Sequence, residues 1–258
     1  PVAEGALVPQ YDTRDNLFGR GGFAFTYNEF NQLIGVETPT AEQWHFVYDG
    51  LGRRRITQHF ATNGTILQHT LHLYQGRLRI EDIDLQSGAS IRYARGQDCS
   101  GTMEDAGGAE GLLWALFSEE PGTPYYYLHD GRGNCSGLLR SGAADWSARY
   151  ACSPFGHPWV EQETALPAPQ PFRMQGKPWL AELGLYDFGR RFYDPMTMRW
   201  LTPDPKGEEA GWNLYEPFQG DPWSRIDPWG EDIIVIIDRD VVMRQGHVGV
   251  AIGLSRMF

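Results

Sequence analysis

The chain has 258 residues, enough for one large or two modest domains with a sizeable core. Its formal net charge of −11 argues against general nucleic-acid binding, because such a protein needs a basic face to meet phosphates. Three cysteines, Cys99, Cys135 and Cys152, cannot all pair and form no CxxC motif. This pattern disfavours a disulfide framework or a zinc site, although a Cys135–Cys152 pair remains open. We expect buried free thiols, no metal and no cofactor.

The composition favours short strands joined by turns. Aromatic residues make up 13% of the chain, beside 31 glycines and 17 prolines. The longest apolar run, residues 233–237, is far too short to span a membrane, and no basic and apolar leader opens the chain. The first residue is Pro1 rather than Met, and we expect the chain to be a piece of a longer polypeptide.

A turn unit recurs along the chain. Each copy has an aromatic-rich strand ending in Tyr, then a polar residue, then a turn that contains glycine and often arginine. Copies are "YDTRDNLFGR" at Tyr11, "FTYNEFNQLIG" at Tyr27, "FVYDGLGRRRI" at Tyr48 and "HLYQGRLRI" at Tyr74, followed by "YYLHDGRGNCSGLL" around His129, "YACSPFGHPWV" at Tyr150 and "GLYDFGRRFYD" at Tyr186. The spacing is irregular. A tyrosine held at one place relative to each turn favours a spiral of hairpins over an ordinary sandwich or barrel, and each tyrosine would then stack on the copy before it.

The copy at Tyr48 shows the local physics. Trp44, Phe46 and Tyr48 alternate with polar or small residues, which places three aromatic rings on one strand face. The Asp49-Gly50 step predicts a tight hairpin whose two central residues have positive φ. Ser87-Gly88 predicts a similar turn.

Helical pattern is scarce. Residues 110–117 fit either a short helix or a strand, because three nearby glycines weaken the helix. Residues 163–171 are rich in proline without an apolar period and predict an exposed loop.

These turns resemble YD repeats, and residues 171–230 resemble the core that closes Rhs/YD-repeat proteins. The segment reads "PFRMQGKPWLAELGLYDFGRRFYDPMTMRWLTPDPKGEEAGWNLYEPFQGDPWSRIDPWG". Relatives of this kind include bacterial polymorphic toxins and the C components of Tc toxin complexes. The resemblance covers about nine-tenths of the chain, and its core motif is the most specific part.

The resemblance implies a mainly β fold, in which antiparallel hairpins wind into part of a hollow shell around a C-terminal effector. It implies residues 1–170 as the YD-repeat region, residues 171–230 as the closing, autoprotease-like segment and residues 231–258 as the start of a variable, toxin-like domain. The chain departs from the pattern twice. Met198 replaces the glycine before the arginine of the "DPxxGR" motif, which strains a turn, and Glu231 replaces the leucine after the closing "DPxG" motif.

Aspartyl self-cleavage would need two carboxylates close enough to share a proton, one activating water and the other protonating the carbonyl oxygen. Asp204 and Asp227 match the two aspartates of the family motifs, while Asp194 and Asp221 are weaker candidates. We expect Arg199 to orient a carboxylate or bind a carbonyl. The competing interpretation is that each Asp-Pro step only caps a turn. The predicted cleavage site comprises Gly230, Glu231 and Asp232, with Glu231–Asp232 as the favoured bond.

Residues 231–258 change character, since a β-branched run and then "GHVGVAIG" predict the first strands of a separate α/β domain. The second strand loosely resembles the histidine strand of papain-like hydrolases, so His247 is a speculative base in a toxin domain. A plain strand-start histidine is the alternative.

Two functional classes follow. In the first, the chain is the end of a toxin shell whose only chemistry is to release its own effector. The implied partners are that effector, an immunity protein and a secretion apparatus, with the protein secreted or at the cell surface. The alternative is a non-enzymatic YD-repeat module for cell-surface adhesion or carbohydrate binding.

Overall fold

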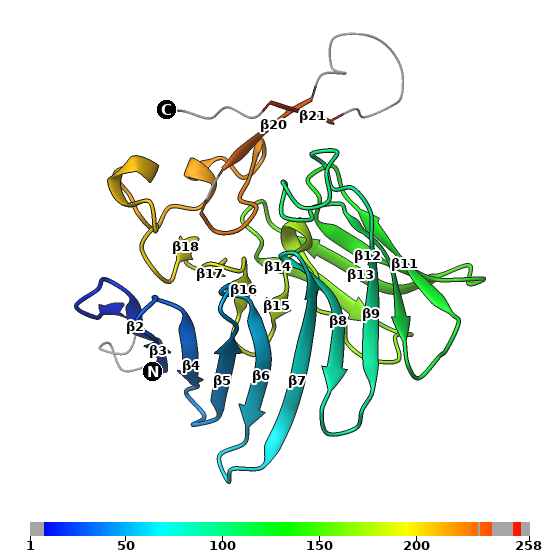
Figure 1. The fold of residues 1–258 in the computed structure, drawn as a ribbon, viewed down its shortest axis with the longest axis horizontal. Helices are drawn as coiled ribbons and strands as arrows, with labels where there is room; N and C mark the ends of the chain where they lie inside the picture. The colour runs from blue at the N-terminus through cyan, green and yellow to red at the C-terminus, as the bar shows by residue number, and fades with distance from the viewer. Residues whose placement is uncertain (1–7, 232, 239–249, 254–258) are drawn as a thin grey trace.

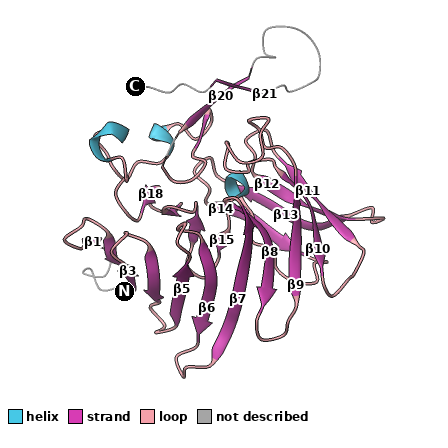
Figure 2. Cartoon of the chain, viewed as in Figure 1, coloured by secondary structure: helices cyan, strands magenta, loops and turns pink. Residues whose placement is uncertain are grey.

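The computed structural model describes residues 8–231, 233–238 and 250–253. Within these ranges the chain is almost entirely β, as predicted, and most of its strands form one 14-stranded antiparallel sheet in strict chain order. Figure 1 shows this sheet as a curved fan running from blue to green, and Figure 2 shows how little helix accompanies it. Its strands are β1 (Gln10–Tyr11), β2 (Leu17–Arg20), β3 (Phe23–Tyr27), β4 (Leu33–Glu37), β5 (Gln43–Tyr48), β6 (Arg54–Phe60), β7 (Ile66–Gln75), β8 (Leu78–Asp84), β9 (Ser90–Arg95), β10 (Leu112–Phe117), β11 (Pro124–His129), β12 (Cys135–Arg140), β13 (Trp146–Cys152) and β14 (Pro158–Glu163).

Two small sheets follow in the C-terminal part. A four-stranded sheet lies within the curve of the large one (Figure 1), and a three-stranded sheet follows it. The first contains β15 (Trp179–Leu180), β16 (Leu185–Asp187), β17 (Phe192–Asp194) and β18 (Arg199–Trp200), and the second contains β19 (Arg225–Ile226), β20 (Ile234–Asp238) and β21 (Val250–Gly253). The short 3-10 helix Met174–Gly176 precedes β15, and two more, Gly207–Ala210 and Phe218–Gly220, lie between β18 and β19.

Several turns that join neighbouring strands of the large sheet share one hydrogen-bond pattern. In the turn at Asp49, the Oδ1 atom accepts the N–H groups of Leu51 and Arg53, and Gly52 takes the left-handed conformation with φ of 77°. The predicted tight turn was therefore wrong, because Gly50 does not have positive φ and the turn spans five residues. The same acceptance of N–H groups two and four residues later occurs at Asp12, Asn28 and Asp130.

Three of the repeated tyrosines each tie their hairpin to the one before. The hydroxyl groups of Tyr27, Tyr48 and Tyr74 donate to the carbonyl oxygens of Leu17, Leu33 and Arg54, at 2.7–2.8 Å. The strand register shifts at each of these tyrosines, as a β-bulge does. Because bulges bend a strand and increase its twist, their repetition at one end of successive hairpins accounts for the curvature of the sheet. Each of these tyrosines thus contacts the preceding copy through its hydroxyl group and not by the predicted stacking of its ring.

The core lies between the large sheet and residues 171–230. Trp44 and Phe46 are buried on one face of β5, as their alternation predicts, and Phe46 stacks on Phe192 of β17 at 5.7 Å between ring centroids. At the other end of the sheet, Phe172 packs edge-on against Tyr93 of β9. The C-terminal segment therefore supplies the second layer of the hydrophobic core and covers the inner face of the curved sheet.

Other expectations are settled by the described residues. Residues 112–117 form strand β10 rather than a helix, Gly88 has the positive φ predicted for its turn, and all three cysteines are free. Residues 164–171 form no strand or helix, but Gln170 is buried, so that loop is only partly exposed. Met198 has φ of 54°, which confirms the strained turn. Beyond Gly230, β20 pairs with β19, and a separate α/β domain stays a prediction.

Removal of one tyrosine hydroxyl tests the hairpin tie. We expect Tyr48→Phe to lower the free energy of unfolding by about 1–2 kcal/mol, because the Leu33 carbonyl loses its partner. Tyr126, which is 45% exposed on β11, is the matched control, and Tyr126→Phe should change the free energy by less than about 0.5 kcal/mol. Urea denaturation measures both, and equal effects would contradict the tie.

Candidate functional site

Asp204 and Asp227 both cap turns in the segment after β18. The Oδ1 atom of Asp227 accepts the N–H groups of Trp229, Gly230 and Glu231, and Gly230 has φ of 76°. The Oδ1 atom of Asp204 accepts the N–H group of Lys206. The turn-capping interpretation is therefore correct for one oxygen of each carboxylate, and it leaves the second oxygen free for other contacts.

Those second oxygens meet at one arginine. A terminal guanidinium nitrogen of Arg191 lies 2.7 Å from Oδ2 of Asp204 and 3.6 Å from Oδ2 of Asp227. Arg191 is only 4% exposed and packs over the Trp200 ring at 4.3 Å. A buried guanidinium that contacts two carboxylates offsets part of their repulsion.

The two carboxylates sit in unequal surroundings. Asp227 is 2% exposed, and burial raises its pKa to about 6 against the opposing pull of Arg191 and of its backbone hydrogen bonds. Asp204 is less deeply buried and lies closer to Arg191. Burial thus favours the protonated form of Asp227 more than it would for an exposed aspartate.

The backbone after Asp227 is held at each residue. The Trp229 carbonyl accepts the N–H group of Arg190, at 3.1 Å, and the Gly230 carbonyl accepts Nε–H of Arg191, at 2.5 Å. The Glu231 carboxylate forms ion pairs with Arg190, at 3.2 Å, and with Arg77 of the large sheet, at 3.8 Å. The predicted cleavage residues Gly230 and Glu231 thus lie directly beside the dyad.

The other predicted residues lie elsewhere. Arg199 is exposed and rests over the Tyr215 ring at 4.9 Å, so it is Arg191 that joins the carboxylates. Asp194 is fully buried in an ion pair with Arg20 of β2, and Asp221 caps a turn with Ser224. Asp232 and His247 lie outside the described residues.

Sequence reasoning missed Arg191, although the chain carries a signal for it. Arg191 opens a run of buried residues that continues with Phe192 and Tyr193, and a charge at the head of an aromatic run is a candidate for a buried, paired group. Its neighbour Arg190 is exposed, and the pair "RR" gives no indication of which member is buried.

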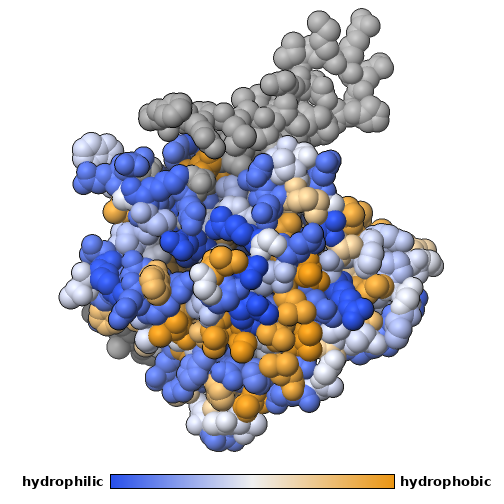
Figure 3. Space-filling view, viewed as in Figure 1, coloured by the Kyte–Doolittle hydropathy of each residue, from blue (hydrophilic) through white to orange (hydrophobic). Residues whose placement is uncertain are grey.

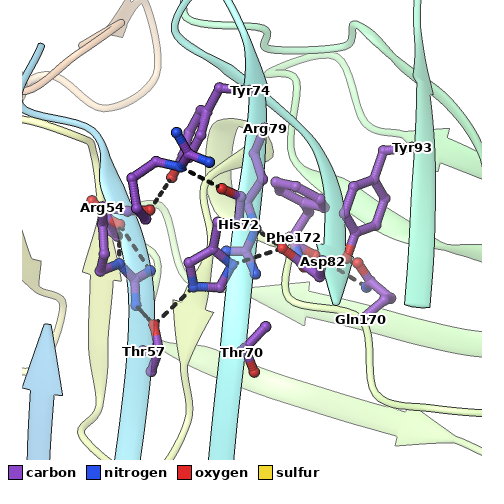
Figure 4. Close-up of polar contacts among 12 residues, drawn as sticks. Arg54, Thr57, Thr70, His72, Tyr74, Arg79, Asp82, Tyr93, Gln170 and Phe172 are labelled. Atoms are coloured by element: carbon purple, nitrogen blue, oxygen red, sulfur yellow. Dashed lines mark hydrogen bonds and ion pairs between the residues drawn. The ribbon is translucent and has the colours of Figure 1, made fainter. Parts of the chain in front are cut away.

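A second polar cluster lies on the inner face of the large sheet. Figure 4 shows His72 between Thr57 and Asp82. His72 Nε2 is 2.8 Å from the Thr57 hydroxyl and Nδ1 is 2.7 Å from Oδ1 of Asp82, whose Oδ2 accepts the Tyr93 hydroxyl proton at 2.6 Å. The order of groups matches a hydroxyl, base and acid, but the Thr57 hydroxyl is buried and accepts a bond from Arg54. We therefore assign this cluster a structural role.

Arg54 extends the cluster to the C-terminal segment. Two of its nitrogens contact Oδ2 of Asp187 in β16, at 2.8 and 2.9 Å, while its guanidinium lies over the rings of Phe46 and Phe192. This buried ion pair joins the large sheet to the four-stranded sheet, and removal of one partner would leave an uncompensated buried charge.

A broad depression of about 920 Å³ lies between the turns of two hairpins. Phe30 and Leu51, each 77% exposed, line it together with His45 and Arg190. Figure 3 shows the hydrophobic side chains of one face gathered among hydrophilic ones. In the part of the chain described, no group of three His, Cys, Asp or Glu residues could hold a metal ion, and no helix is long and apolar enough to cross a membrane.

No family model matches the chain, but several proteins are similar in sequence. The Escherichia coli K-12 protein YlbH is 39% identical over 79 residues, which are 30% of this chain and 33% of YlbH. Double-stranded DNA deaminase toxin A of Burkholderia cenocepacia is 27% identical over 223 residues, which are 80% of this chain and 15% of the toxin. The chain thus spans a third or less of the length of these two relatives.

The fold matches a solved toxin structure. The Tc holotoxin pore of Photorhabdus luminescens aligns with 93% of this chain and 11% of its own chain, with a TM-score of 0.68 and 19% identity. This likeness shows a toxin-shell-like fold. The predicted resemblance to the Rhs/YD-repeat family is confirmed.

The His72 cluster predicts acid sensitivity. Burial, with help from Arg79, lowers the pKa of His72 to about 3 against the pull of Asp82. Because the unfolded histidine binds its proton near pH 6.5, stability is lost as the pH falls from 6.5 toward 3, by about 2 kcal/mol at pH 5. Urea denaturation should show a smaller acid loss for His72→Gln, which stays neutral. Identical pH dependence in both chains would contradict the assignment.

Proposed function

We propose that the chain is the C-terminal part of an Rhs/YD-repeat polymorphic toxin shell that encloses a C-terminal effector and frees it by aspartyl self-cleavage just after Gly230. The observation that carries the proposal is the contact of Arg191 with both Asp204 and Asp227, next to the backbone of residues 228–231. The toxin-shell-like fold and the similarity to toxins support the setting.

The proposed chemistry divides between the two carboxylates. Asp204 takes a proton from a water molecule, whose oxygen attacks the scissile carbonyl carbon, while Asp227 gives its proton to the carbonyl oxygen. The tetrahedral intermediate then collapses with breakage of the C–N bond. The departing amine takes the proton held by Asp204, and the hydroxyl proton of the intermediate returns to Asp227, so that a carboxyl end and a new amino end form without a cofactor.

Two neighbouring bonds compete for this chemistry. The resemblance favours Glu231–Asp232, whereas Arg191 donates to the carbonyl of Gly230, which belongs to the Gly230–Glu231 bond. The first amino acid of the released fragment, Asp232 or Glu231, distinguishes them. In both cases the cut falls between β19 and β20, where the proposed shell segment 171–230 passes into the proposed effector segment 231–258.

The proposal extends to the setting of the whole protein. Residues 1–170 would form the YD-repeat wall, with the effector as its cargo, and an immunity protein and a secretion apparatus as further partners. The protein would act outside the cell that makes it, secreted or at the cell surface.

A non-enzymatic adhesion or carbohydrate-binding module is the alternative. Three exposed tryptophans support it, since exposed indole rings stack on sugars: Trp159 is 68% exposed, Trp212 fully exposed and Trp223 66% exposed. A chain that is never cut and that binds glycans on an array would favour this alternative.

Loss of either carboxylate should stop self-cleavage. We expect Asp204→Asn and Asp227→Asn to slow the appearance of two fragments at least about 100-fold, because the dyad loses its base or its acid. Gel electrophoresis with mass spectrometry of the fragments measures the rate. Asp221→Asn is the matched control, since it changes a third Asp-Pro step in the same segment whose carboxylate only caps a turn.

The same assay separates Arg191 from Arg199. Arg191→Lys should slow cleavage, because one ammonium cannot hold two carboxylates and the Gly230 carbonyl together, while Arg199→Lys should cut at the wild-type rate. A wild-type chain that stays whole under all conditions, or cleavage that survives in Asp227→Asn, would refute the proposal.

The raised pKa of Asp227 predicts how cleavage depends on pH. Asp227 acts in its protonated form, so the rate should fall as the pH rises through about 6, approaching ten-fold per unit at higher pH. Chain isolated uncut under denaturing conditions and diluted into buffers from pH 5 to 8.5 gives the profile, with circular dichroism as a check on folding. A rate that rises with pH over this range would contradict the role of Asp227 as the acid.

A further inference from the structure

Lys177 is a buried cation that the proposed chemistry leaves unused. It is 4% exposed and lies just after the short 3-10 helix Met174–Gly176. Its Nζ donates to the carbonyl of Pro228, at 2.5 Å, and to the carbonyl of Gly107, at 2.8 Å. It thus joins the turn that begins at Asp227 to the loop between β9 and β10 of the large sheet.

The backbone around Lys177 is fixed at both ends. The Lys177 N–H group donates to the Met174 carbonyl and the Lys177 carbonyl accepts the N–H group of Arg173. Within this turn, Oε1 of Gln175 accepts the N–H group of Asp227, at 3.2 Å. The short turn at residues 174–177 therefore holds both the backbone nitrogen of Asp227 and the carbonyl oxygen of Pro228.

Gly107 permits this close approach. It has φ of 66°, and an added Cβ atom would lie 2.1 Å from the Pro228 oxygen and 2.4 Å from Lys177 Nζ. A side chain at position 107 would therefore push the loop, the ammonium and the Pro228 carbonyl apart.

We propose that Lys177 is a positioning residue for self-cleavage, which ties the Pro228 carbonyl to the large sheet and so fixes Asp227 and the following residues against Arg191. This inference rests on the proposed function. Both hydrogen bonds go to backbone carbonyls, so the ammonium acts through geometry and through its charge near Asp227, and it does not touch the reacting atoms.

The charge of Lys177 should affect the pH dependence of the cleavage rate, which a purely structural role would leave unchanged. Burial lowers the pKa of Lys177 to about 7; Asp227 and Asp187 oppose that shift, and Arg95 and Arg77 add to it. In its charged form Lys177 lowers the pKa of Asp227. Its removal should therefore raise the pKa of Asp227 and move the alkaline fall of the cleavage rate to higher pH.

The test compares Lys177→Met with Arg95→Met in the full chain. We expect the Lys177→Met chain to cleave itself at least about 10-fold more slowly. The alkaline limb of its pH–rate profile, where the cleavage rate falls, should shift to higher pH by a measurable fraction of a pH unit. Arg95 is also a buried cation, held by the Arg79 carbonyl and the Phe172 ring. Its loss removes one cause of the lowered pKa of Lys177 and so keeps the ammonium charged, which should change the stability without moving the limb upward. An unchanged rate and profile for Lys177→Met would overturn the inference.

A second variant keeps the test decisive if Lys177→Met does not fold. Gly107→Ala retains the ammonium but pushes it, the loop and the Pro228 carbonyl apart, so it should also cut at least about 10-fold more slowly. A wild-type rate for Gly107→Ala would overturn the inference.

If the wild-type chain is never cut, the proposed function fails, and the tie is judged by hydrogen exchange. In that case Lys177→Met must increase exchange at residues 225–231 relative to Arg95→Met. Equal exchange in this segment would overturn the tie itself.

Discussion

The whole structure depends on one local interaction, a side-chain oxygen that caps a five-residue turn. At Asp49 it accepts two backbone N–H groups and sets a glycine three residues later in the left-handed conformation. Repeated along the sheet, this turn reverses the chain, and the tyrosine bulge beside it bends the sheet. Asp227 uses the same geometry, with Gly230 as its left-handed residue. The candidate site is therefore built on a copy of the structural turn. In this copy, the second carboxylate oxygen, Oδ2 of Asp227, lies beside the buried Arg191.

That arginine changes what the turn can do. An isolated buried carboxylate would simply be protonated, and two of them would repel one another. Arg191 places a positive charge within 3.6 Å of both carboxylates and so stabilises their negative charge. The cost of burying Arg191 is met by these contacts, by the Gly230 carbonyl and by the Trp200 ring. The same contacts that stabilise the charge also orient the backbone beside it.

The sequence predicted the features that depend on nearby residues. Alternation predicted the buried face of β5, because that signal lies within a few residues. Asp204 and Asp227 came from the resemblance to the family motifs, since the chain has four Asp-Pro steps and the local pattern does not distinguish them. Arg199 was a poor guess for the opposite reason: it is close to Asp204 along the chain, but its side chain lies over Tyr215 at the surface. The tight turn at Asp49-Gly50 failed because the dipeptide rule does not describe a turn closed by a side chain.

The contacts that join distant parts of the chain were beyond a single sequence. Arg54 meets Asp187 across 133 positions, and Lys177 meets Gly107 across 70. The turn at Asp227 and the residues that follow it are surrounded by side chains and backbone from distant parts of the chain, at positions 77, 107, 177, 191 and 204. The geometry proposed for cleavage is therefore complete only when the large sheet is packed on the C-terminal segment. An unfolded or half-folded chain would have the same two aspartates without Arg191 between them. Self-cleavage of the proposed kind would therefore follow the assembly of the wall, and a cargo would be freed only after the sheet that is to enclose it has formed.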